Sequence, residues 1–296
     1  MDYDLTIEND LIEVFPADSG DITVDAARYS LLAGGKRLRP KMMYMTYQML
    51  TGEDDVSCDV RYFATTLEMI HTYSLIHDDL PCMDNDDLRR GKPTCHKKYG
   101  EGVATLAGDL LLNTAMERLF RIILDKPEYA YACYKMASLA GGSGMIGGQS
   151  IDISSEGKKI SLEKLYELQR KKTGALIETA IVTPYYLINK VDMNDPASDT
   201  VLDKLIRFAG HLGLAFQIRD DILDVDSDPA TLGKSTGKDE RDNKSTFVTL
   251  LGYDEAKVKL DNEIEMANQI LDELAASGFK VDSYREMTEY LRKRKN

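Results

Sequence analysis

The sequence lacks the features that mark secreted, zinc-binding and membrane-spanning proteins. Only four of its 296 residues are cysteines, and none of them forms a CxxC pair, which argues against a disulfide framework or a zinc site. No apolar run reaches the roughly 20 residues that a membrane span requires. The chain begins with acidic residues, whereas a signal peptide begins with basic ones. We therefore expect a reduced, cytoplasmic protein without a membrane span.

Positive charge is scarce as well. The chain has 37 lysines and arginines against 50 aspartates and glutamates, so its formal net charge is −13. This balance argues against a nucleic-acid partner or an anionic membrane surface, because both select a basic face. The basic residues that are present gather at 36–39, 89–90, 170–172 and 234–244, each group beside glycines or aspartates. Arginine and lysine in such settings suit phosphate groups.

Linkers are also missing, and helical spacing dominates the chain. No stretch rich in proline, glycine and serine divides it, and the eight prolines are scattered singly, as expected at corners between helices. Apolar residues recur every three or four positions at 60–70 and 205–212, while clean strand alternation is absent. We predict one all-α domain over residues 1–296, a bundle of roughly ten or more helices.

The first acidic cluster, HDDLPCMDNDD at 77–87, stands where a predicted helix ends. Helical geometry puts His71, Ser74 and Asp78 near one face, and Pro81 stops the helix. Clustered carboxylates repel one another unless a cation joins them, and magnesium prefers such hard oxygen ligands. A solvated acidic loop is the simpler interpretation. An EF-hand loop is excluded, because leucine and arginine occupy the positions where that loop needs a ligand and a glycine.

The second acidic cluster lies in GLAFQIRDDILDVD at 213–226. Asp220 and Asp224 are four positions apart on one helical face, with Gln217 three positions before Asp220. Like charges at this spacing destabilise a helix by roughly 0.2–0.5 kcal/mol, and a shared metal would turn that repulsion into binding. A surface amphipathic turn is the alternative. A helical bundle that joins the ends of the two acidic helices would form one cavity with acidic walls.

Together these motifs resemble those of the trans-isoprenyl diphosphate synthases, most closely the bacterial farnesyl diphosphate synthases. They cover the chain from about residue 25 to 255 and follow the order of that family. The matching segments are GGKRLRP at 34–40, HDDLPCMDNDDLRRGKPT at 77–94, LAGDLLL at 106–112, GGQSID at 147–152, KKTG at 171–174, GLAFQIRDDILD at 213–224 and the lysine loop at 234–244.

The resemblance implies an all-α fold of mostly antiparallel helices around a deep central cavity, assembled as a homodimer. It also implies a magnesium-dependent prenyltransferase that condenses isopentenyl diphosphate head-to-tail with dimethylallyl and then geranyl diphosphate. Cations positioned around the diphosphate stabilise the negative charge that builds up when the allylic C–O bond breaks. Apolar walls shield the carbocation from water. In this family the proton is lost to the departing diphosphate, and the sequence offers no obvious protein base.

The resemblance assigns these roles residue by residue. The expected ligands of three magnesium ions are Asp78, Asp79, Asp84, Asp220 and Asp224. The residues expected to bind isopentenyl diphosphate are Lys36, Arg39, His71 and Arg90. The residues expected to bind the allylic diphosphate are Arg89, Lys172, Lys234, with Lys238 as its alternative, and Lys244. Thr173 and Gln217 are expected to face the forming cation. Of all these we expect the catalytic residues to be Asp78, Asp79, Lys172, Thr173, Gln217 and Asp220.

Product length in this family is set by the residues four and five positions before the first aspartate, here Ser74 and Tyr73. An aromatic residue at Tyr73 and the two-residue insertion in the first motif resemble bacterial farnesyl-type enzymes. We therefore predict the C15 product, farnesyl diphosphate, with the C20 product, geranylgeranyl diphosphate, as the alternative. Ordinary packing between helices is the competing interpretation of Tyr73.

Three other classes of protein compete with this prediction. A terpene cyclase would lack GGKRLRP and a second DDxxD, and this chain has both. A non-catalytic subunit of a heteromeric synthase would have lost aspartates from one cluster, and none is missing. A structural or simple metal-binding helical protein would leave the paired basic motifs unexplained. The basic end, LRKRKN at 291–296, either closes over the isopentenyl diphosphate site or is a solvated terminus.

Overall fold

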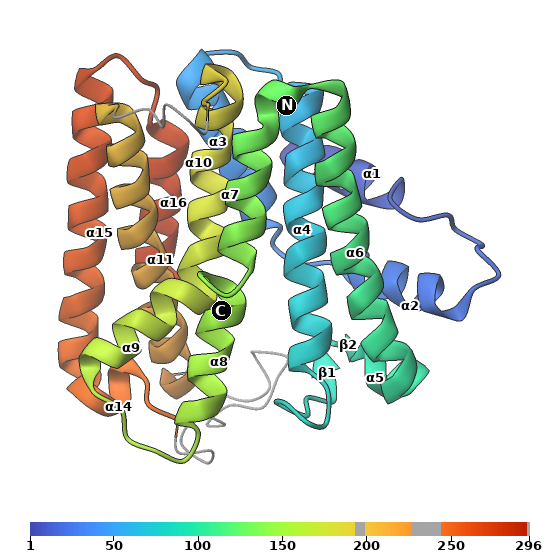
Figure 1. The fold of residues 1–296 in the computed structure, drawn as a ribbon. Coiled ribbons are helices and arrows are strands. Elements are labelled where there is room, and N and C mark those ends of the chain that lie inside the picture. The colour runs from blue at the N-terminus through green and yellow to red at the C-terminus, as the bar shows by residue number, and fades with distance from the viewer. Residues whose placement is uncertain (193–198, 227–243, 295–296) are drawn as a thin grey trace.

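The computed structural model describes residues 1–192, 199–226 and 244–294, and Figure 1 shows them as a bundle of long, mostly antiparallel helices. The predicted all-α fold is confirmed. The helices of the first half are α1 (Tyr3–Ile12), α2 (Ile22–Leu31), α3 (Leu38–Thr51), α4 (Cys58–Asp78), α5 (Cys95–Tyr99) and α6 (Glu101–Asp125). The middle of the chain forms η1 (Pro127–Tyr129), α7 (Ala130–Ala140), α8 (Met145–Ser155), α9 (Leu162–Gln169), η2 (Arg170–Gly174) and α10 (Ala175–Asn189). The last part forms α11 (Thr200–Asp226), α14 (Phe247–Leu251), α15 (Tyr253–Ala276) and α16 (Asp282–Lys293).

Helix α4 lies at the centre of the first half, packed between α3 and α6. Ser57 caps its start by accepting a hydrogen bond from the backbone N–H of Val60 at 3.3 Å. Most of the side chains of α4 are buried, so tertiary packing rather than local propensity holds it. The helix ends at Asp78, three residues before Pro81, as the sequence predicts. Its end therefore presents the first acidic cluster at one end of the bundle.

Two short strands follow this cluster, and the sequence did not predict them. Strands β1 (Leu88–Arg89) and β2 (Lys92–Pro93) pair antiparallel. The turn between them is Arg90-Gly91, and both residues have positive φ, at 54° and 74°. Two consecutive positive φ values are typical of the turns that close two-residue hairpins. Strands of two residues are too short to produce an alternating pattern, which is why periodicity missed them.

The expectation that prolines mark corners is wrong for Pro184, which lies inside α10. A proline in a helix interior removes one backbone hydrogen bond and crowds the preceding turn. Helix α10 tolerates it because almost its whole length is buried against α3, α7 and α11. Packing therefore outweighs local preference at this position.

None of the helices in the described ranges is long and apolar enough to cross a membrane.

Candidate active site

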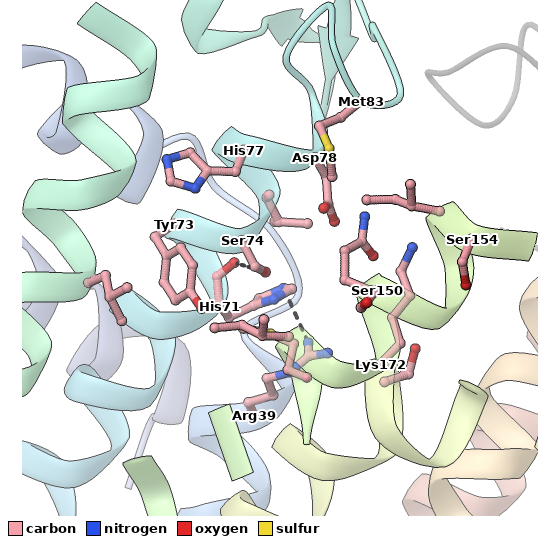
Figure 2. Close-up of a pocket in the computed structure, with 17 residues that line it drawn as sticks. Arg39, His71, Tyr73, Ser74, His77, Asp78, Met83, Ser150, Ser154 and Lys172 are labelled. Carbon is pink, nitrogen blue, oxygen red and sulfur yellow. Dashed lines mark hydrogen bonds between the residues drawn. The ribbon is translucent and has the colours of Figure 1, made fainter. Parts of the chain in front are cut away.

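A cavity of about 680 Å³ is lined by side chains from α4 and α8 (Figure 2). Its lining includes the charged and polar side chains of Arg39, His71, Asp78 and Lys172. The rest of the wall is largely apolar and is formed from α4, α6 and α8. Its apolar side chains are Tyr73, Leu75, Met83, Leu112, Met145, Ile146 and Ile153. The deep cavity that the resemblance implies is therefore present.

The two neighbouring aspartates at the end of α4 have different surroundings. Asp78 is half-buried, lines the cavity and points toward α8 (Figure 2). Burial raises the pKa of the Asp78 carboxyl to about 6; the positive charge of Lys172 opposes this shift and the negative charge of Asp84 adds to it. Asp79 is only 3% exposed, and both of its carboxylate oxygens accept hydrogen bonds from Nε of Arg89 at 2.8 Å. Only Asp78 of this pair faces the cavity.

Asp84 connects the first cluster to the distant second half of the chain. Its backbone N–H donates to the carbonyl oxygen of Asp78 at 2.8 Å, which holds the loop against the end of α4. Its carboxylate accepts a hydrogen bond from Nζ of Lys244 at 3.0 Å. Lys244 lies just before α14, so this contact joins the first cluster to the segment that follows α11 in the chain.

The second aspartate pair on α11 repeats the arrangement of the first. Asp220 is exposed and forms an ion pair with Nη1 of Arg294 at 2.6 Å. Asp221 is only 3% exposed, and its Oδ2 accepts a hydrogen bond from the backbone N–H of Phe247 at 2.8 Å. Asp224 is half-buried one turn beyond Asp220. Asp221 therefore fixes the start of α14, while the Asp220 side chain is 51% exposed.

The arginine on Asp220 belongs to the basic end of the chain. Arg294 follows α16, and its backbone oxygen accepts a hydrogen bond from Nη2 of Arg219. Within the described residues the end of the chain thus lies against the second acidic cluster. Closure of the basic end over the isopentenyl diphosphate site stays a prediction. Just before this end, the ring centroid of Tyr290 on α16 lies 5.9 Å from Nζ of Lys36.

Thr173 and Gln217 are in contact, as the resemblance leads one to expect for two residues at one reacting centre. The Thr173 hydroxyl donates to Oε1 of Gln217 at 3.1 Å, and Nε2 of Gln217 donates to Oδ1 of Asp221 at 2.8 Å. The two contacts fix which end of the Gln217 amide faces Thr173. The DDxxD motif contains Asp221, but the motif alone does not show which of its aspartates contacts Gln217.

A π-helical turn, η2 at Arg170–Gly174, carries Lys172 and Thr173. Turns of this kind are rare and are frequent at functional sites. Gly148 of α8 lies against it so closely that a Cβ there would be 2.1 Å from the backbone nitrogen of Lys172. Nζ of Lys172 contacts Oδ2 of Asp152 at 2.5 Å. Sequence reasoning missed Asp152, although the GGQSID segment that contains it was singled out.

Arg39 and His71 form the basic wall of the cavity. Nη1 of Arg39 lies 3.2 Å from Nε2 of His71, and because arginine can only donate, Nε2 accepts and the ring proton sits on Nδ1. Burial lowers the pKa of His71 well below its usual value, and the charges of Arg39, Arg90, Arg89 and Arg37 lower it further. Nε of Arg39 is buried and has no hydrogen-bond partner among the described residues. A neutral histidine and an unsatisfied guanidinium N–H suit an incoming anion.

The basic residues Lys36 and Arg37 of the GGKRLRP segment and Arg90, which packs on its glycines, lie in three different settings. Arg90 of the hairpin donates to the carbonyl oxygen of Gly34 and covers Gly35, where a Cβ would be 2.6 Å from the guanidinium carbon. Lys36 is exposed. Arg37, which sequence reasoning did not assign a role, is buried; its Nε donates to Glu8 at 2.7 Å and its Nη1 to Glu68 at 2.9 Å. Arg37 thereby ties α1 to α4.

The two residues predicted to limit product length both line the cavity. Ser74 donates to the backbone oxygen of His71 at 2.9 Å. The Tyr73 ring is 5% exposed, and its hydroxyl is buried without a hydrogen-bond partner in the described part of the chain. Burial raises the pKa of the Tyr73 phenol to about 12. Lys234 and Lys238 lie outside the described residues.

The carboxylates fit magnesium only in combination with a substrate. Within the described ranges no three histidine, cysteine or carboxylate side chains are close enough together to hold a metal ion unaided. Magnesium characteristically keeps several waters and binds through one or two carboxylates plus substrate phosphates. Asp78 and Asp84, whose loop is tied to the end of α4, supply oxygen ligands of that type. A diphosphate beside Lys172 would supply the rest.

The polyprenyl synthetase family model matches residues 21–286 of the chain. The farnesyl diphosphate synthase of Escherichia coli is 42% identical over 273 residues, covering 90% of this chain and 88% of the relative. The farnesyl diphosphate synthase of Geobacillus stearothermophilus is 44% identical over 249 residues, covering 83% and 80%. A chloroplastic geranylgeranyl pyrophosphate synthase of Arabidopsis thaliana is 41% identical over 276 residues, covering 92% and 76%.

Solved structures of similar proteins share the fold over nearly the whole chain. The geranyltransferase of Legionella pneumophila superposes with a TM-score of 0.80 at 30% identity, covering 99% of this chain and 93% of that one. The geranyltransferase of Helicobacter pylori, crystallised with magnesium and isoprenyl diphosphate, superposes with a TM-score of 0.75 at 31% identity, covering 93% and 95%.

Proposed function

Because the chain belongs to the polyprenyl synthetase family, we propose that it is a magnesium-dependent prenyltransferase that makes farnesyl diphosphate. It condenses isopentenyl diphosphate head-to-tail with dimethylallyl diphosphate and then with geranyl diphosphate. One observation carries this proposal: a single cavity is lined both by cationic and carboxylate groups and by many apolar side chains. Such a cavity suits a substrate with an anionic head and a hydrocarbon tail.

Isopentenyl diphosphate binds, in this proposal, at Lys36, Arg39, His71 and Arg90. The unsatisfied Nε of Arg39 supports this assignment, because a buried guanidinium N–H is costly unless it has an acceptor. Neutral His71 can donate through Nδ1 while Nε2 stays on Arg39. The close packing of Arg90 on Gly34 and Gly35 keeps its guanidinium near the same wall.

The allylic diphosphate binds, in this proposal, between the two acidic clusters. Three magnesium ions held by Asp78, Asp79, Asp84, Asp220 and Asp224 would neutralise its oxygens and assist its departure as a leaving group. Asp79 can join this set only by exchanging its contacts with Arg89, whereas Asp78 already faces the cavity. The cations expected to contact this diphosphate are Arg89, Lys172, Lys234 and Lys244.

The protein's own groups stabilise the charges that form in the reaction and exclude water from the cavity. Lys172 is held at the cavity wall by Asp152 and by the close contact of η2 with α8, so its charge is in place before the C–O bond breaks. Thr173 and Gln217 present oriented dipoles toward the forming cation. The apolar walls from α6 and α8 exclude water from that cation.

Product length is the feature that separates farnesyl diphosphate synthase from the alternative, a geranylgeranyl diphosphate synthase. We infer a C15 product because Tyr73 occupies the wall of the cavity below Asp78. The similarity to the Arabidopsis geranylgeranyl pyrophosphate synthase supports the C20 product as the alternative, and the length of the product distinguishes the two.

Tyr73→Ala is expected to shift the main product from C15 to C20 or longer, because it removes an aromatic ring from the cavity wall. One methylene in an apolar pocket already changes discrimination by about 10- to 200-fold, and a phenol is much larger. Product lengths from farnesyl and geranyl diphosphate measure the shift. Tyr73→Phe is the matched control and is expected to keep the C15 product, because the hydroxyl has no described partner. Unchanged C15 output from Tyr73→Ala would remove Tyr73 from this role.

The proposed activity is tested with purified protein, isopentenyl diphosphate, magnesium and each allylic diphosphate in turn. We expect turnover with dimethylallyl and geranyl diphosphate and a C15 end product, and no turnover after chelation of magnesium. Absence of turnover with every allylic substrate would contradict the enzyme proposal. Turnover with a C20 end product would favour the alternative.

We also propose that residues 1–296 form one polyprenyl synthase domain that acts as a cytoplasmic homodimer. A core that runs from Ile7 to Leu291 supports the single domain. All four cysteines carry free thiols, which is compatible with a reducing compartment. Large apolar side chains exposed on α6, among them Phe120 at 70% and Leu124 at 83%, would be covered by a second copy.

A further inference from the structure

Helix α4 contributes two sets of side chains to the cavity. Asp78 points toward α8, whereas Tyr73 and His77 lie on the side that faces α6 (Figure 2). Tyr73 and His77 are four positions apart, so they are stacked one turn from each other on the helix. Their rings meet edge to face, with centroids 5.9 Å apart and planes 75° apart. His77 is thus the ring that flanks Tyr73 on the side of the acidic cluster.

His77 is held in place from α6. Its Nε2 lies 3.1 Å from the backbone oxygen of Thr105, and because a carbonyl can only accept, Nε2 carries the hydrogen. The same nitrogen is 3.8 Å from Oδ1 of Asp109. The imidazole therefore spans the space between α6 and the Tyr73 ring.

Gly108 of α6 creates the room for this ring. A Cβ at Gly108 would lie 2.1 Å from Nε2 of His77 and 2.5 Å from its Cδ2. Glycine in a helix interior costs roughly 0.5–1 kcal/mol relative to alanine, and Gly108 is well inside α6. The close approach of His77 accounts for a glycine at this position.

The Tyr73 phenol is held by packing, and the His77 ring is one of the groups that it contacts. Its hydroxyl has no hydrogen-bond partner within the described ranges, so packing alone fixes the ring. His77, Tyr73 and Leu112 line the same cavity. A change in the position of His77 must therefore change the space available beside Tyr73.

We propose that His77, seated against Gly108, is a positioning residue that holds the Tyr73 ring at the cavity wall and so limits product length. The inference rests on the proposed prenyltransferase function and adds to it a contact between α4 and α6. Removing the His77 ring frees space beside Tyr73, which lengthens the product. A methyl group at Gly108 pushes the imidazole toward Tyr73 and the cavity, which shortens the product.

The experiment compares His77→Ala, Gly108→Ala and the double variant by the ratio of products. His77→Ala is expected to raise the C20-to-C15 ratio by about tenfold or more, the scale of apolar pocket discrimination. Gly108→Ala is expected to raise the C10-to-C15 ratio from dimethylallyl diphosphate by a similar factor. In the double variant the methyl group fills part of the space left by the ring, so its C10-to-C15 ratio is expected to return toward the wild-type value.

Two controls separate positioning from general destabilisation. Gly210→Ala places a methyl group on α11 where nothing lies within 4 Å, and it is expected to leave the product ratio unchanged. In a Tyr73→Ala background, His77→Ala is expected to change the ratio by less than about twofold, because His77 acts through Tyr73. Independent, multiplying effects of the two substitutions would overturn the positioning role.

The outcome is scored on product ratios from folded, active variants, so it is distinct from the test of the function itself. Wild-type protein that makes no prenyl product contradicts the proposed function. Active wild type with unchanged ratios in both His77→Ala and Gly108→Ala overturns the inference alone. If Gly108→Ala does not fold, His77→Gln replaces it: its amide can still donate to Thr105, and the smaller side chain is expected to raise the C20-to-C15 ratio.

Discussion

Asp78→Asn is expected to lower kcat/KM for geranyl diphosphate by about 100- to 1,000-fold, the usual effect of removing one preorganised electrostatic group from a reacting centre. Asp78 is the member of the first aspartate pair that faces the cavity, and asparagine keeps its shape while removing its charge. Little loss of stability is expected, because burial and neighbouring carboxylates already oppose its ionisation. Steady-state kinetics and thermal unfolding of the same preparation measure both effects.

Asp79→Asn is the matched control for this prediction. It weakens the hydrogen bonds with Arg89 and leaves that guanidinium without its buried counter-charge, so a loss of about 1–3 kcal/mol in the free energy of unfolding is expected. Its effect on kcat/KM is expected to be smaller than that of Asp78→Asn. Equal activity losses for the two variants, with no loss of stability in Asp79→Asn, would contradict the division of roles between the two aspartates.

Arg37→Met is expected to lower the free energy of unfolding by about 3–5 kcal/mol, the usual cost of breaking a buried ion pair from one side. The Arg37 side chain is fully buried and its partner Glu68 is 2% exposed, so the variant leaves a carboxylate without a partner inside α4. Denaturant unfolding at neutral pH measures the loss. Lys41→Met, which breaks an exposed pair with Asp4, is the control and is expected to cost less than about 1 kcal/mol.

A second substitution tests the reason for this loss. Adding Glu68→Leu to Arg37→Met removes the stranded carboxylate, and replacing both members of a buried pair by apolar groups is often neutral or stabilising. The double variant is therefore expected to recover most of the lost stability. A double variant that stays as unstable as Arg37→Met would mean that the contacts of Arg37 with Glu8 and with the backbone of Leu31 carry the effect.

The sequence predicted the elements whose signals are local. Helical spacing identified the long helices, and the spacing of His71, Ser74 and Asp78 correctly placed all three on the cavity side of α4. Pro81 correctly marked the end of that helix. Pro184 was misjudged because its tolerance depends on burial of α10 by other helices, which no local pattern contains.

The same limit applies within the site. The sequence pattern treats the two aspartates of a DD pair as equivalent ligands. Only the folded hairpin shows that Arg89 binds the carboxylate of Asp79. In GGKRLRP the pattern gives three equivalent basic residues, yet Arg37 turns inward toward Glu8 and Glu68. Gly108 and His77 lie in separate motifs, so nothing in the sequence joins them before α4 and α6 pack together.

The contact between Lys244 and Asp84 has a consequence for how the chain acquires its activity. It joins residues 160 positions apart, and bringing such distant segments together carries an entropic cost that rises with the length of the intervening loop. A partly exposed ion pair contributes at most about 1 kcal/mol and cannot drive that closure. The packing of α10 against α3 and of α11 against α10 supplies the contacts that hold the halves together. The acidic site is therefore complete only when both halves are packed together, and neither half of the chain can build it alone.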